Sequence, residues 1–167
     1  MMFRRSLVGV LALAAGLPAA ARAHTDHGET DYGKPGDPKK PARIVQVVMR
    51  EADGRMLFVP DRLKVRKGEQ IRFLLRNNGE IDHEFVIGTV EDNRKHMKAM
   101  ESHPDMEHDD PNAKRLKPKA TGEIVWQFTK AGTFEFACLI PGHYPAGMVG
   151  TIKRIVTQGA ELLNQIR

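Results

Sequence analysis

The sequence predicts an all-β domain with the architecture of a Greek-key β-sandwich, and three observations lead to this class. Short segments alternate apolar and polar side chains, as at Leu63 and Val65 and again from Ile71 to Leu75. Turn residues separate these segments, with Gly68 before the second and the run Asn77-Asn78-Gly79 after it. Roughly seven or eight such segments occur along the 167 residues, with no fixed-period repeat. A sandwich of short strands accounts for all three.

The same alternation predicts where two reactive side chains point. It continues through residues 83–87, 124–128 and 134–138. In a strand, every second side chain faces the same side of the sheet. His83 and Cys138 share the parity of the core side chains. We therefore expect both to point inward, each at the end of a strand.

One charged stretch interrupts the strand pattern. Residues 91–119 are interpreted as an insertion into the sandwich. Within it we expect one helix, from about Asp92 to Ser102, because Pro104 disfavours its continuation. The fold class is therefore an all-β sandwich with a charged, partly helical insertion.

The first 23 residues have the pattern of a secretory signal peptide. Arg4 and Arg5 precede an uncharged apolar run, and the small residues Ala21 and Ala23 form a cleavage site. The run is too short to span a bilayer comfortably. We therefore expect cleavage after Ala23, a periplasmic protein, and no stable insertion into the membrane.

The segment after the signal is polar and rich in Gly and Pro. Residues 24–42 therefore predict a flexible, disordered leader ahead of a domain over residues 43–167. Three arginines leave with the signal, which lowers the formal net charge of +5 by three, to +2. A charge this small removes the main support for nucleic-acid binding.

The candidate chemistry centres on the single cysteine of the chain. Cys138, His143 and Met148 follow one another at intervals of five residues, between two expected strands. A thiolate, imidazoles and a weak axial thioether are the donors that copper uses for electron transfer, and His83 supplies the second imidazole. A buried inert thiol is the alternative for Cys138. Zinc knuckles need paired cysteines and a hydrolase needs an exposed thiolate, so we regard both as weaker alternatives.

These residues resemble the cupredoxins, the blue copper proteins, and among them the azurin and rusticyanin type of bacterial periplasmic carrier. His83, at the start of its strand, matches the upstream histidine of that family. Cys138, His143 and Met148 match its thiolate, its downstream imidazole and its axial thioether. The approach to the cysteine, Gly132 to Cys138, is also similar.

The resemblance extends over roughly Ile44 to Val156, most of the chain that remains after the signal. It implies a β-sandwich with one type 1 copper ion at its end, held by His83, Cys138, His143 and Met148. The chain differs from many members in carrying Glu84, where they have Asn directly after the first histidine.

The leading functional interpretation is a periplasmic blue copper protein that carries single electrons as copper alternates between +2 and +1. The resemblance implies that electrons pass through His143, so we expect a redox protein partner to dock near it, and a monomer. We expect no enzyme. Multicopper oxidases are expected to carry histidines on both sides of the cysteine, where this chain has Ala137 and Leu139, and a binuclear copper A site needs a second cysteine.

A second group of soft donors lies in the insertion. Thioethers and imidazoles suit Cu(I), which makes this group a possible secondary copper site. The alternative is that its methionines simply cover the sandwich. We call it the Met/His segment, and its members are His96, Met97, Met100, His103, Met106 and His108.

The leader offers weaker donors. Cleavage after Ala23 would give His24 a free α-amine beside its imidazole, and His27 follows, so the pair could chelate Cu(II); incidental histidines are the alternative. With the Met/His segment, these donors support a second function, a copper-tolerance protein that binds, buffers or oxidises periplasmic Cu(I). The number of copper ions bound separates the two functions.

Overall fold

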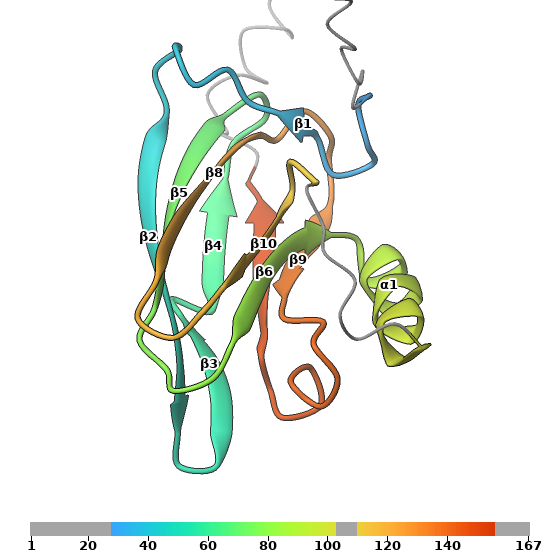
Figure 1. Cartoon of the computed structure of the whole chain (residues 1–167). Helices are drawn as coiled ribbons and strands as arrows, with labels where there is room; N and C mark the ends of the chain where they lie inside the picture. Colours follow the sequence, from blue (N-terminus) through green and yellow to red (C-terminus); the bar gives the residue numbers. More distant parts are fainter. Residues whose placement is uncertain (1–27, 103–109, 156–167) are drawn as a thin grey trace, which may run out of the picture.

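The computed structural model describes residues 28–102 and 110–155, which form two five-stranded sheets packed face to face (Figure 1). The first sheet contains, in spatial order, β1 (Lys34–Pro35), β8 (Thr121–Gln127), β5 (Gln70–Asn77), β2 (Arg43–Ala52) and β3 (Arg55–Val59). The second contains β4 (Arg62–Val65), β10 (Val149–Arg154), β9 (Thr133–Ala137), β6 (His83–Gly88) and β7 (Ala113–Leu116). The predicted β-sandwich is confirmed.

Non-local pairing builds both sheets. β2 pairs in parallel with β5, and β4 in parallel with β10, while the other neighbours are antiparallel. In the first pair Val45 lies opposite Phe73, so apolar side chains of the two strands share one face. Most of the buried side chains form one core between the sheets.

Aromatic rings fill the middle of this core. Phe85 and Phe136 stack with ring centroids 5.1 Å apart, and Phe58 meets each of them edge-on. Gly150 lies opposite Phe136 on the neighbouring strand, and a side chain there would come within 2.1 Å of the ring. The strand that leads to Cys138 is therefore held rigidly from both sides.

The insertion contains the expected helix, α1 (Val90–Ser102), which begins two residues earlier than predicted. Thr89 caps it, since its hydroxyl oxygen accepts a hydrogen bond from the amide of Asp92 at 3.0 Å. The helix packs against β6 and β9, so all six residues of β6 are buried.

The insertion also holds a strand that the sequence did not reveal. β7 pairs antiparallel with β6, and only its first and last residues, Ala113 and Leu116, are buried. Because these two residues are three positions apart, β7 lacks the alternation of buried and exposed residues that predicted the other strands. This strand of the insertion therefore completes the second sheet rather than standing apart from it.

The described part of the leader, residues 28–42, differs from the flexible segment expected over residues 24–42. β1 pairs with β8, and the ring of Tyr32 stacks on Trp126 at a centroid distance of 5.5 Å. The indole nitrogen of Trp126 donates to the carbonyl oxygen of Tyr32 at 3.1 Å. The buried side chain of Trp126 thus holds in place a segment whose average composition indicates disorder. The expected signal peptide lies outside the described residues.

None of the helices in the described part of the chain is long and apolar enough to cross a membrane.

Candidate metal centre

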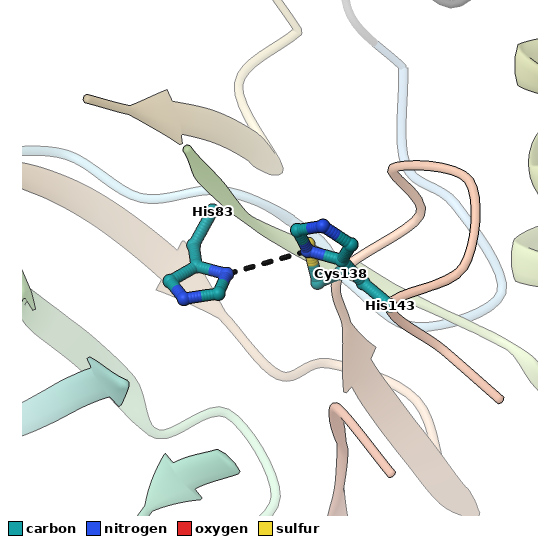
Figure 2. A group of neighbouring side chains, drawn as sticks. All are labelled: His83, Cys138 and His143. Atoms are coloured by element: carbon teal, nitrogen blue, oxygen red, sulfur yellow. Dashed lines mark hydrogen bonds between the residues drawn. The ribbon is translucent and has the colours of Figure 1, made fainter. Parts of the chain in front are cut away.

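Three side chains meet at one end of the sandwich (Figure 2). His83 is the first residue of β6, Cys138 directly follows β9, and His143 lies in the loop between β9 and β10. His83 and Cys138 are fully buried, as their strand parity predicts, and His143 is 7% exposed. The structure thus joins residues that are 60 positions apart in the chain.

The donor atoms of these residues converge. Nδ1 of His143 lies 3.3 Å from Nδ1 of His83 and 3.2 Å from Sγ of Cys138. All three candidate ligand atoms lie within 4.8 Å of one another, and this is the one such group found in residues 28–102 and 110–155. One sulfur and two imidazole nitrogens around a common point fit a copper ion.

Met148 belongs to the same loop. It is fully buried, its amide donates to the carbonyl oxygen of His143 at 3.1 Å, and its own carbonyl oxygen accepts from the amide of Cys138 at 3.1 Å. These two backbone bonds close the loop around the three candidate donors. The axial position of the Met148 sulfur stays a prediction.

Glycines allow the loop its tight course. Gly142 and Gly147 have φ values of +88° and +98°, a region that other residues rarely adopt. The amide of His143 donates to the carbonyl oxygen of Ile140 at 3.0 Å, which makes the turn through Pro141 and Gly142. The loop therefore presents the His143 ring toward Cys138.

Burial keeps the thiol of Cys138 protonated in the metal-free protein. Loss of solvent raises the pKa of Cys138 to about 12, although the amide of Glu84 donates to its sulfur at 3.2 Å. A cation that binds the sulfur must displace this proton. The hydrogen bond to the Cys138 sulfur comes from the backbone amide of Glu84. It therefore does not require the Asn side chain that many family members carry at this position.

Burial also keeps both imidazoles neutral. It lowers the pKa of His83, against the opposing charge of Glu51, and lowers that of His143, where neighbouring His83 acts in the same direction. Neutral imidazole is the form that binds metal.

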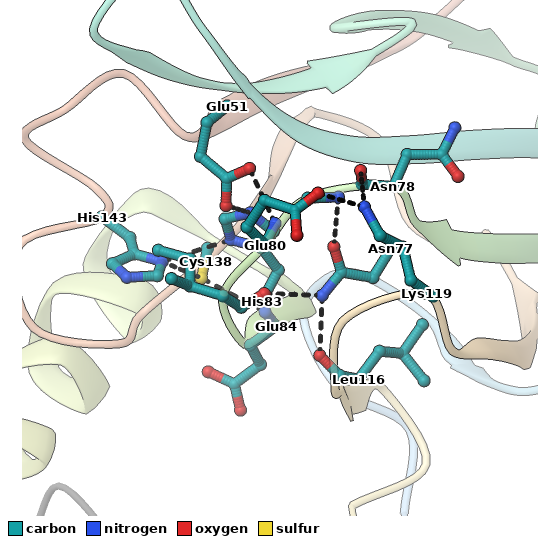
Figure 3. A network of polar contacts seen from close by, with 12 residues as sticks. Glu51, Asn77, Asn78, Glu80, His83, Glu84, Leu116, Lys119, Cys138 and His143 are labelled. Atoms are coloured by element: carbon teal, nitrogen blue, oxygen red, sulfur yellow. Dashed lines mark hydrogen bonds and ion pairs between the residues drawn. The ribbon is translucent and has the colours of Figure 1, made fainter.

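A polar network supports the centre from outside (Figure 3). A carboxylate oxygen of Glu51 lies 2.9 Å from Nε2 of His83. Buried Asn77 donates to the carbonyl oxygens of Ile81 and Leu116 and accepts from the amide of Gly79, which fixes the loop before His83. Sequence reasoning treated Asn77 only as a turn residue and missed Glu51, since nothing local distinguishes it among 21 acidic residues.

The secondary donors that the structure describes, His96, Met97 and Met100, lie on α1 and do not join this centre. Met100 is buried, and half-buried Met97 packs against a small apolar cluster that includes Leu139. These contacts agree with the alternative that the methionines cover the sandwich. His96 is half-buried on the same helix. Five candidate donors lie outside the described residues, namely His24, His27, His103, Met106 and His108.

The fold and this donor set define a copper protein, and residues 45–154 match the family of copper binding proteins described as the plastocyanin/azurin family. The chain belongs to this family, the cupredoxins, and copper is its metal. A crystal structure of auracyanin B shares the fold with a TM-score of 0.60 and 24% identity, over 76% of this chain and all of that one.

Two relatives share more of the sequence. The "Copper-resistant cuproprotein CopI" of Rubrivivax gelatinosus is 53% identical over 134 residues, which cover 80% of this chain and 79% of that protein. The protein with the same description in Pseudomonas aeruginosa is 35% identical over 182 residues, covering 90% of this chain and 98% of its own.

Proposed function

We propose that this protein holds one type 1 copper ion with His83, Cys138, His143 and Met148 and carries single electrons in the periplasm. The observation that supports this most directly is the convergence of one sulfur and two imidazole nitrogens within 4.8 Å, all buried. Bound copper supplies one-electron chemistry by alternating between +2 and +1.

The chain's own residues make such a centre rigid. The amide of Cys138 donates to the carbonyl oxygen of Met148, and its sulfur accepts from the amide of Glu84. His83 is held by its place in β6 and by the contact with Glu51. Donors held in place before the metal arrives need little rearrangement when its charge changes. Closely packed protein cores resist displacement of their side chains.

Electrons would enter and leave through His143, the one candidate ligand with any exposure. Exposed Pro141, Gly142 and Pro145 surround it and offer a small apolar surface to a redox partner. Leu139 is fully buried and does not contribute to this surface. We expect the redox partner to dock at this surface, and we expect the protein itself to be a monomer.

A copper titration followed by visible absorption tests the ligand set. The wild-type protein should take up one Cu(II) ion with an intense charge-transfer band. Cys138→Ser should lose the band, and His143→Ala should weaken or lose it. His96→Ala is the matched control, since it removes a half-buried imidazole outside the centre. An undiminished band in Cys138→Ser would refute the assignment.

We expect electron transfer rather than catalysis at this centre. Ala137 and Leu139, both fully buried, flank Cys138 and offer no donor to a second copper ion. Within the part of the chain that the structure describes, only one group of candidate ligands is found. Oxidation of Cu(I) with sustained O2 consumption by the copper-loaded protein would contradict this expectation.

Copper resistance is the second candidate function, and the descriptions of the CopI relatives favour it. The protein would then bind, buffer or oxidise Cu(I), with the Met/His segment as an additional capture site. Replacing Met97, Met100 and Met106 together with Leu keeps their apolar volume and removes only the sulfur donors. Extra Cu(I) binding should disappear while the visible band stays. Unchanged Cu(I) stoichiometry would exclude capture by this segment.

The periplasmic location depends on export. We expect cleavage after Ala23, so that the mature chain begins at His24. Intact-mass measurement of the protein from a periplasmic extract tests this. A mass that includes residues 1–23 would show a retained signal.

A further inference from the structure

The contact between Glu51 and His83 joins the two sheets at the copper end of the sandwich. Glu51 lies near the end of β2, in the first sheet, and His83 begins β6, in the second. Oε1 of the carboxylate is 2.9 Å from Nε2 of the imidazole, and the His83 side chain is fully buried. The bond therefore uses the one ring nitrogen of His83 that does not face Cys138 and His143.

The other carboxylate oxygen is held as well. Oε2 of Glu51 accepts a hydrogen bond from the amide of Glu80 at 3.1 Å. Gly79 makes room for the carboxylate, because a side chain at that position would come within 2.5 Å of Oε2. A loop between β5 and β6 thus forms a cradle for this one side chain.

Two hydrogen-bond partners converge on the Glu51 carboxylate, the backbone amide of Glu80 and Nε2 of the buried His83 ring. An ionised carboxylate only accepts hydrogen bonds. Nε2 of His83 must then carry the ring proton, which leaves the lone pair of Nδ1 directed at the other donors.

We infer that Glu51 is a positioning residue of the copper centre, which fixes the tautomer of His83 and lowers the reduction potential through its negative charge. The inference rests on the ligand set proposed above. A carboxylate bonded to a ligating imidazole makes that imidazole a more basic ligand. A more basic ligand favours Cu(II) over Cu(I).

Nitrogen NMR of the metal-free protein tests the tautomer without copper. In the wild-type protein the His83 ring should be protonated on Nε2, and Glu51→Ala should give a mixture of the two tautomers. Glu51→Gln should keep the Nε2 proton, because the amide oxygen can still accept it. A wild-type ring protonated on Nδ1 would overturn the inference, whatever the copper titration shows.

The reduction potential tests the charge. Glu51→Gln keeps shape and removes the charge, and we expect its preference for Cu(II) over Cu(I) to fall about tenfold. For one electron this corresponds to a rise of ~59 mV. Glu80→Gln is the matched control, since it removes a charge from the same loop. That side chain is 81% exposed, pairs with Lys119 and does not touch His83.

Several outcomes decide the matter. A larger rise in Glu51→Gln than in Glu80→Gln supports the inference, and equal potentials overturn it. If Glu51→Gln folds but binds no copper, the NMR spectrum of that metal-free variant decides. Loss of the proton from Nε2 of His83 would support the positioning role, and a retained Nε2 proton would contradict it. If the variant does not fold, the wild-type NMR measurement decides. A wild-type protein without the visible band would instead refute the ligand set.

Discussion

Cys138 is a thiol in the metal-free protein because its surroundings exclude water, and the same burial keeps the imidazoles of His83 and His143 neutral. The centre thus carries no charge of its own before metal binds. A thiol with a pKa of about 12 has roughly one thiolate in 100,000 molecules at neutral pH. Copper uptake by this sulfur, as proposed above, would therefore be coupled to the loss of its proton.

Between pH 7 and pH 8, each Cu(II) ion bound should release about one proton. The thiol loses its proton on binding, and the imidazoles have none to lose because burial holds their pKa values below the usual one. Apparent affinity should therefore rise about tenfold for each pH unit. Proton release in an unbuffered titration measures this, with Cys138→Ser as the control that releases none. Uptake without proton release would show that the sulfur is not a ligand.

Met148 gives a second prediction for a single residue. In the proposed axial position, its thioether would tune the potential more than it holds the metal. Met148→Leu should keep copper and the visible band but raise the reduction potential. The rise is ~59 mV for each tenfold increase in the preference of the site for Cu(I) over Cu(II). Voltammetry measures the shift. Loss of all copper from a folded Met148→Leu protein would argue against an axial role.

The loop between β9 and β10 is the element that assembles the centre, because it supplies His143 and Met148 and follows Cys138 directly. Its conformation depends on glycine at positive φ. At Gly142 an added methyl group would meet no atom within 4 Å, so the cost of a side chain there comes from the backbone alone. Gly68 has the same property in a distant turn.

Gly142→Ala should lower the free energy of unfolding by about 1–2 kcal/mol and also shift or weaken the visible band. The loop relieves the strain by moving the adjacent His143. Gly68→Ala should cost a similar amount of stability, since its φ is +75°, and leave the band unchanged. Urea unfolding and visible spectra of both variants measure these effects. An unaltered band in Gly142→Ala would show that the loop tolerates the change.

At the scale of the whole molecule, both sheets contribute residues that hold the centre. The second sheet supplies His83 and leads to Cys138, while the first supplies Glu51. The leader closes the far edge of the first sheet through β1. Its hydrogen bonds over residues 28–42 include those with β8, β5 and Asn112, and none is made with His83, Cys138, His143 or Met148, so stability and copper binding should separate there.

Tyr32→Ala should lower the free energy of unfolding by about 2 kcal/mol, because it removes the stack on Trp126 and its buried area. Tyr32→Phe keeps the ring and loses the hydrogen bond that Asn112 donates to the hydroxyl, so it should cost less. Copper binding and the visible band should stay unchanged in both variants. Denaturant unfolding measures the difference. Equal stability of wild type and Tyr32→Ala would show that the stack contributes nothing.

Local patterns were enough to predict the sandwich and the helix of the insertion, and they singled out His83, Cys138 and His143, which the structure brings together. Alternation of apolar residues follows from strand geometry, and the spacing of Cys138, His143 and Met148 lies within one loop. Such features depend on neighbours along the chain. The inward direction of His83 follows from the parity of its strand alone.

Tertiary structure decided the rest. Glu51 meets His83 across 32 residues and two sheets, and Tyr32 meets Trp126 across 94. β7 is a strand only because β6 offers it an edge. No local pattern marks these residues, since their roles arise when distant segments pack and each is left beside a particular partner. Pairing between distant segments depends on the whole fold, and that is why composition predicted a flexible leader where residues 28–42 are ordered in the structure.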